Sequence, residues 1–338
     1  MRKPVIGALL SLAAAPVGLQ AAPNDRLSVY CSAHARHCDE MATAFSGATG
    51  IRVDVTHLNP ADALRRIATE TNEPRGDVWW GGSYLIHLEA ASRNLTQEYE
   101  PPRLWQLYAW AVSAAQRSGY RAFPIHAIPQ RFAFNDHEFT TPRHAPKCWE
   151  ALMAPSLVGR VDVRLSSAAL TALAAITPLS ALIGESRAVE LILQHQNKLA
   201  GPSAILGAAQ RPELEPQVSL ILDDGYDPAL DGRVWQVVTP CEGTSFTMSA
   251  ASIVRGTYNF TGAEAWLDWT LSAEGQAISR KADPFLVPSH RTVAVPAREV
   301  DQVDRFLNGQ PLADAIGAAA QARLKSRLES AHGQFTKE

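Results

Sequence analysis

The sequence predicts an α/β protein of two lobes. Strand-like and helix-like segments alternate from residue 27 to residue 93, which is the order of a parallel sheet covered by helices on both faces. This alternation breaks between residues 120 and 125, and a new strand-like segment begins at residue 131. The chain of 338 residues is also long enough for two lobes.

The N-terminus has the order of a cleavable secretory signal. Two basic residues precede a mostly apolar run from Val5 to Leu19, and small residues follow it. The run is short for a membrane span. We expect residues 1–22 to be removed by cleavage near Ala21 or Ala22, which leaves an exported, periplasmic protein.

The charge balance gives no reason to expect a nucleic-acid partner. The chain has 31 Lys and Arg against 34 Asp and Glu, a formal net charge of −3. Loss of the two basic residues of the signal moves the net charge to about −5. The exported chain therefore has no excess of basic residues for a polyanion.

The first lobe is expected to begin with three strand and helix pairs. Asn59 supplies an N-cap and Pro60 a first-turn proline for the second helix, and Gly47 or Gly50 ends the first. The segments in order are strand 27–30, helix 39–45, strand 51–55, helix 60–70, strand 77–80 and helix 85–93.

Two glycines and a hydroxyl follow the third strand. Gly81, Gly82 and Ser83 lie between the apolar strand and the next helical pattern. In an open α/β sheet such turns lie at the carboxyl ends of strands, where ligands bind. Glycine lets a ligand approach the backbone, and free N–H groups at a helix start attract anions. We interpret this segment as a candidate binding turn, although a tight turn without a ligand would have the same sequence.

The second lobe is expected after a helix over residues 105–116 and a crossover near residues 120–125. A helix over 263–271 later returns to the first lobe, with Trp266 and Trp269 toward its core. The segments expected between these points are strand 131–135, strand 161–163, a helix from 167, a helix around 190–196, strand 218–222 and strand 234–238.

Four cysteines form an even set in an oxidising compartment. His34 and His37 lie between Cys31 and Cys38, so a metal site is one interpretation. A single short segment would then have to wrap four ligands round one ion, whereas a disulfide needs only its two ends to meet. We therefore expect a Cys31–Cys38 disulfide. By elimination Cys148 pairs with Cys241, and this long loop is worth roughly 4–5 kcal/mol against about 2.5 for the short one.

Several of these segments together resemble one protein family. They are Cys31-Ser32-Ala33 with Cys38, residues 76–82, Cys148-Trp149, the run Pro240-Cys241-Glu242-Gly243-Thr244, and Phe285-Leu286-Val287-Pro288-Ser289. In order and spacing the chain resembles the periplasmic solute-binding proteins of ABC importers, in the type II group that binds ferric iron or hexose phosphate.

The resemblance implies the type II periplasmic-binding-protein fold, with two α/β lobes, a ligand cleft and two hinge crossovers. Residues 1–22 would be the signal peptide, residues 23–124 and 246–338 lobe 1, and residues 125–245 lobe 2.

The candidate ligand-binding residues lie at predicted turns and at the hinge. Each hydroxyl at such a turn is as well suited to cap a helix as to contact a ligand. For Asp224, the alternative to a ligand contact is a solvated carboxylate in a loop. The candidates are Ser32, Gly82, Ser83, Ser166, Ser167, Asp224, Thr244 and Ser245.

The chain departs from the hexose-phosphate pattern at several of these positions. The run from Gly82 to His87 lacks the aspartate of the family motif, and Thr247 stands where a second glutamate is expected. Among the ferric-ion binders two adjacent tyrosines follow strand 218–222, where this chain has Gly225 and Tyr226. These differences favour another solute.

The resemblance implies that the protein captures a small polar or anionic solute by lobe closure. A sugar phosphate, a phosphonate or another organic anion is expected, for delivery to an inner-membrane ABC permease. The alternatives are ferric-iron binding and a sensing role beside a membrane histidine kinase. No sequence motif of a nucleophile elbow, zinc protease, redox dithiol or nucleotide loop is present, so we expect no enzymatic activity. We also expect no cofactor and no bound metal. The protein is expected to be a monomer.

Overall fold

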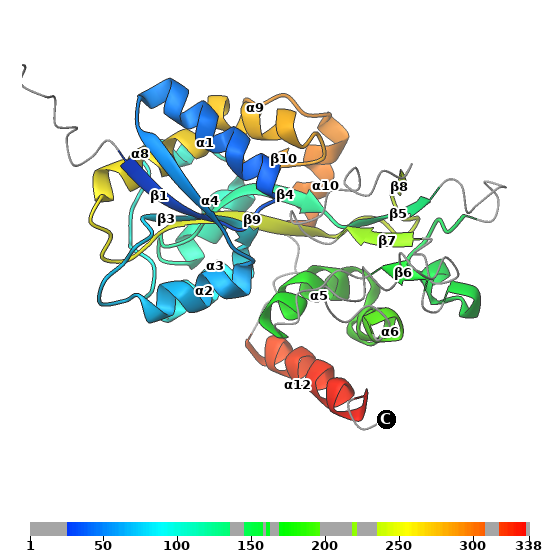
Figure 1. The fold of residues 1–338 in the computed structure, drawn as a ribbon. Coiled ribbons are helices and arrows are strands. Elements are labelled where there is room, and N and C mark those ends of the chain that lie inside the picture. The colour runs from blue at the N-terminus through cyan, green and yellow to red at the C-terminus, as the bar shows by residue number, and fades with distance from the viewer. Residues whose placement is uncertain are drawn as a thin grey trace, which may run out of the picture.

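The computed structural model describes residues 26–135, 145–157, 160–162, 169–196, 218–221, 235–307 and 318–335. They form two sheets with helices packed on them (Figure 1). Among the helices in these ranges, none has both the length and the apolar character needed to span a membrane.

The larger sheet has six strands in the order β10-β4-β9-β3-β1-β2. Its parallel part is the predicted one, since β1 pairs with β2 and β3 in parallel. The remaining neighbours are antiparallel. The strands are β1 (Arg26–Cys31), β2 (Arg52–His57), β3 (Val78–Ser83), β4 (Phe123–Pro129), β9 (Phe246–Ile253) and β10 (Val287–Pro288).

Helices cover both faces of this sheet, with α1, α8 and α9 on one side and α2 and α3 on the other (Figure 1). Neighbouring tryptophans show the alternation of a strand. Trp80 packs in the core under α1, whereas Trp79 packs with residues of α2 and α3. The helices are α1 (Ala35–Thr49), α2 (Pro60–Thr69), α3 (Tyr84–Ser92), α4 (Ala109–Arg117), α8 (Phe260–Thr270), α9 (Ala273–Ala282) and α10 (Ala297–Leu307).

The smaller sheet has four strands in the order β6-β7-β5-β8, with α5, α6 and α12 beside it. Trp149 and Phe132 pack edge to face in its core. The elements are β5 (Arg131–Asn135), two short 3-10 turns (Glu150–Met153 and Pro155–Leu157), β6 (Val161–Asp162), α5 (Ala169–Ile183), α6 (Glu185–Gln196), β7 (Val218–Ile221), β8 (Trp235–Val238) and α12 (Ala318–Phe335).

The chain passes between the sheets at Gln130 and again through residues 239–245. The first strand of the expected second lobe lies as predicted at Arg131–Asn135, but residues 125–129 continue β4 in the six-stranded sheet. The expected helix 105–116 is a 3-10 turn at Leu104–Gln106 followed by α4, because the backbone turns at Leu107 to pair with His290.

Two elements differ from the sequence-based expectation. Strand β9 was not expected, yet all its residues are buried at the centre of the six-stranded sheet. Helix α12 was assigned with residues 246–338 to lobe 1, but it packs on α5 and α6 of the other lobe. Leu324 is 2% exposed in the core of that lobe, and this burial explains the placement.

Candidate solute-binding site

Three helices of the larger lobe begin where its parallel strands end. α1 follows β1, α2 follows β2 and α3 follows β3 (Figure 1). The first turns of α1 and α3 hold no acidic residue, whereas α2 has Asp62 there. The positive ends of α1 and α3 are therefore not neutralised by their own carboxylates, so this edge of the sheet favours an anion.

Ser32 stands directly after β1 and is 6% exposed. Its amide donates to the Trp80 carbonyl at 2.8 Å, which ties it to the end of β3. Its Oγ accepts a hydrogen bond from Trp79 Nε1 at 2.9 Å. The hydroxyl proton of Ser32 is thereby turned away from the indole and is available to an acceptor.

Gly81 and Gly82 lie near the end of β3 with φ values of 84° and 82°, in the left-handed region that favours glycine. Both belong to the strand, whereas the sequence analysis placed them in the turn after it. A Cβ on Gly81 would lie 2.6 Å from the Ala33 nitrogen, and one on Gly82 would lie 3.0 Å from Cγ of Pro60. The glycines thus let the end of β3 lie close to the segment after β1 and to the start of α2.

Ser83 is the N-cap of α3, because its Oγ accepts a hydrogen bond from the Leu85 amide at 3.3 Å. It is 8% exposed. Of its two expected uses, the structure shows the cap, and the hydroxyl proton is still able to donate to a solute.

The hinge holds Ser245 in a reciprocal contact with Gln130. Ser245 Oγ donates to Gln130 Oε1 at 2.7 Å, and the backbone N–H of Gln130 donates to the backbone carbonyl of Ser245 at 2.7 Å. Both side chains are 0% exposed. Ser245 therefore joins the two crossovers, while its neighbour Thr244 is only partly buried.

The second crossover is also fixed to the smaller lobe. The disulfide Cys148–Cys241 is formed, as is Cys31–Cys38, which confirms both predicted pairs. The Glu242 carboxylate accepts hydrogen bonds from the amides of Trp149 at 2.8 Å and Glu150 at 2.9 Å. In the described ranges, the one group of potential metal ligands is Cys148, Cys241 and Glu242, and these bonds already occupy it.

Helix α5 of the smaller lobe lies against α2, α3 and β3 of the larger one. The candidate edge is thus faced by an element of the opposite lobe. Ser166, Ser167 and Asp224 fall outside the described residues, so the part of the site that they were expected to form is not placed.

The cations nearest to these turns in sequence have other contacts. Arg36 Nε donates to Glu40 Oε1 at 2.8 Å on the exposed side of α1. The guanidinium carbon of Arg131 lies 4.1 Å from the centre of the Phe285 ring. Helix starts are accordingly the main positive groups that the described residues bring to this edge.

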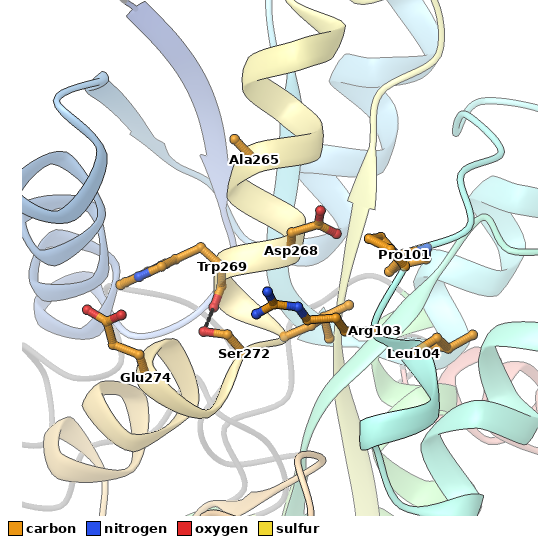
Figure 2. Close-up of a pocket in the computed structure, with 10 residues that line it drawn as sticks. Pro101, Arg103, Leu104, Ala265, Asp268, Trp269, Ser272 and Glu274 are labelled. Carbon is orange, nitrogen blue, oxygen red and sulfur yellow. Dashed lines mark hydrogen bonds between the residues drawn. The ribbon is translucent and has the colours of Figure 1, made fainter.

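A separate cavity of about 410 Å³ lies where α8 meets α9, lined in part by Pro101, Arg103 and Asp268. Figure 2 shows Arg103 reaching into the space between Asp268 and Ser272. Asp268 Oδ2 accepts from the Tyr99 hydroxyl at 3.0 Å, and burial raises the pKa of Asp268. No candidate ligand-binding residue within the described ranges is among the residues that line this cavity.

A known family covers most of the chain. The family described as bacterial extracellular solute-binding protein matches residues 87–311, well over half of the sequence. The chain belongs to this family. An uncharacterised protein of Haemophilus influenzae is 26% identical over 261 residues, which span 76% of this chain and 75% of that protein.

Solved structures of periplasmic binding proteins resemble this solute-binding protein. AfuA from Actinobacillus pleuropneumoniae, with fructose-6-phosphate bound, gives a TM-score of 0.72 at 22% identity and covers 89% of this chain and 97% of AfuA. Iron-bound HitA from Pseudomonas aeruginosa gives 0.67 at 20% identity and covers 90% and 99%. The expected type II periplasmic-binding fold is confirmed.

Sequence reasoning missed four side chains that shape this region: Trp79, His87, Gln130 and Glu242. All four are held by contacts with residues distant in sequence, and His87 bonds both the distant Ser252 and Gly81 of its own strand and helix unit. The available signal was Trp79, which stands two residues before the glycine pair.

Proposed function

We propose that this solute-binding protein captures a small organic anion, such as a sugar phosphate or phosphonate, between its lobes. The observation that carries the proposal is the meeting of the α1 and α3 starts, without first-turn acids, with the hydroxyls of Ser32 and Ser83. A negative group is stabilised there by about 0.3–1 kcal/mol per exposed helix start and by up to about 2 when partly buried.

Binding is proposed to favour the closed arrangement of the lobes. A solute that touches the strand ends of one lobe and α5 of the other makes its full set of contacts only when the lobes are shut. The Ser245–Gln130 pair keeps the two crossovers together while they bend.

The test is a thermal-shift screen followed by calorimetric titration. The compounds are fructose-6-phosphate, a simple phosphonate, a dicarboxylate and Fe(III) citrate. A ligand at a hundredfold excess over its Kd should stabilise the protein by about 2.7 kcal/mol. X-ray scattering should show a smaller radius of gyration with the hit. Turnover of the compound, or an unchanged scattering curve, would contradict capture by closure.

Ferric-iron binding is the second candidate, and the likeness to iron-bound HitA favours it. The iron proposal and the organic-anion proposal predict opposite results in the same thermal-shift screen. A shift with Fe(III) citrate that is absent with iron-free citrate, and no shift with fructose-6-phosphate, would establish iron as the solute. Tyr226 would then be the first residue to replace.

We also propose that the protein is exported after cleavage near Ala21 or Ala22, acts as a monomer and delivers its solute to an ABC permease. N-terminal sequencing of the protein from a periplasmic extract tests the cleavage. Stimulation of the ATPase of a reconstituted permease encoded beside it tests delivery. If a neighbouring membrane histidine kinase responds in its place, the role is sensing.

A further inference from the structure

His87 is buried beneath the end of β3 and makes two directed hydrogen bonds. Its Nε2 lies 2.9 Å from the Gly81 carbonyl oxygen and its Nδ1 lies 2.8 Å from Ser252 Oγ. The side chain is 0% exposed. A carbonyl only accepts, so Nε2 carries the proton and Nδ1 accepts from the Ser252 hydroxyl.

Trp79 connects this histidine to Ser32. The two rings stack with centroids 3.8 Å apart and an interplanar angle of 18°. At its other end the Trp79 indole donates Nε1–H to Ser32 Oγ at 2.9 Å. One contiguous set of contacts therefore runs from Ser252 on β9 through His87 and Trp79 to the serine after β1.

These contacts also restrict the directions of two hydrogen-bond donors that do not take part in them, the Gly82 N–H and the Ser32 hydroxyl proton. The Gly81 carbonyl and the Gly82 N–H belong to one planar trans peptide and point in opposite directions. A hydrogen bond that holds the carbonyl toward His87 therefore holds the Gly82 N–H away from it. In the same way, the Trp79 indole N–H occupies one lone pair of Ser32 Oγ. This limits the directions in which the Ser32 hydroxyl proton can point.

We infer that Trp79 and His87 are positioning residues that orient the Ser32 hydroxyl toward a bound solute and fix the plane of the Gly81–Gly82 peptide beside the proposed site. The inference rests on the proposed function, because the oriented groups are those of the proposed site. Since Ser252 lies on the strand that arrives from the hinge, the same contacts link the site to β9.

The test compares Trp79→Phe with Trp266→Phe. The first keeps an aromatic ring against His87 but removes the donor to Ser32. The second removes an equally buried indole, 1% exposed, whose Nε1 has no hydrogen-bond partner among the described residues. With fructose-6-phosphate as the probe in calorimetry, we expect Trp79→Phe to raise Kd about threefold to tenfold and Trp266→Phe to leave it nearly unchanged.

His87→Phe and His87→Gln form a second pair. Phenylalanine keeps the stack on Trp79 without either hydrogen bond, whereas glutamine restores an N–H within reach of the Gly81 carbonyl. We expect a weaker affinity for the phenylalanine variant and partial rescue by glutamine. If all four variants lose affinity in proportion to their loss of thermal stability, Trp79 and His87 contribute packing alone. That result would overturn the inference.

A readout without solute separates this inference from the proposed function. In nitrogen-15 NMR spectra of the free protein, the Gly82 and Ser83 amide signals should move in His87→Phe and return toward their original positions in His87→Gln. Unmoved signals would overturn the positioning role. If the signals move but no variant, nor the unaltered protein, binds the probe, the positioning role stands and the proposed solute class fails.

Discussion

At the scale of single residues, Ser83 has two separable roles. It caps α3 through the Leu85 amide, as Ser272 caps α9 through the Gly275 amide at 3.2 Å. Replacement of either serine by alanine should cost about 1 kcal/mol of stability, because a helix-start N–H loses its acceptor. Only Ser83 lies at the proposed site, so only Ser83→Ala should also weaken binding of fructose-6-phosphate. Urea unfolding and calorimetry on both variants measure this, and equal affinities would mean that Ser83 is a cap alone.

Gly81 shows how strongly one backbone position restricts the site. Its φ of 84° strains any L side chain, and a Cβ there would meet the Ala33 nitrogen at 2.6 Å. We expect Gly81→Ala to lower the free energy of unfolding by about 2 kcal/mol or more. Gly47 in α1 is the matched control, because nothing lies within 4 Å of its added Cβ. Gly47→Ala should stabilise by about 0.5–1 kcal/mol, and a neutral Gly81→Ala would show that the strand end is more adaptable than argued.

At the scale of elements, local patterns predicted most of the fold and part of the site. Strand β5 and the capped start of α2 at Asn59 follow from alternation and turn chemistry that lie within a few residues. The same logic located Ser32, Gly82 and Ser83 at strand ends. The Ser245–Gln130 pair spans 115 residues, so no local pattern contained it.

Strand β9 was missed for a physical reason. Its sequence, FTMSAASI, is rich in small and hydroxyl residues, and its apolar and polar alternation breaks at Ala251. A central strand covered on both faces needs no such alternation, since both sets of side chains are buried. Its identity follows from the neighbours that pair with it, β3 and β4.

Helix α12 was assigned to the wrong lobe because its contacts are with α5 and α6, which lie far from it in sequence. Leu324 is 2% exposed in the core of the smaller lobe. Arg327 adds an exposed ion pair with Glu185 at 3.1 Å, which is worth little by itself. We expect Leu324→Ala to cost about 2 kcal/mol or more and Arg327→Ala less than about 1. Unfolding curves decide this, and a neutral Leu324→Ala would mean that α12 does not stay docked.

At the scale of the whole molecule, three buried histidines share one electrostatic property, and His290 shares it to a lesser degree because burial also lowers its pKa. Burial lowers the pKa of His37 and of His87 to about 4, and the pKa of His126 lies well below its ordinary value of 6.5. The Ser279 hydroxyl lies between two of them, 2.7 Å from His37 Nε2 and 2.6 Å from His126 Nε2. The folded protein thus keeps all three rings neutral at pH 7.

Stability should therefore fall as the pH drops from about 6.5 toward 4. Below pH 6.5 these histidines bind protons in the unfolded chain but not in the folded protein. Each of them therefore lowers the free energy of unfolding by up to about 1.4 kcal/mol per pH unit. Partly buried Asp268 and Glu264 have raised pKa values and act in the opposite direction at lower pH, so the clearest window is pH 5 to 6.5. Urea unfolding of the unaltered protein and of His126→Gln, which keeps a partner for Ser279, should give a slope about one quarter to one third smaller for the variant, since His37, His87 and His290 still contribute. Equal slopes, or stability that rises toward pH 5, would show that these rings accept protons in the folded protein.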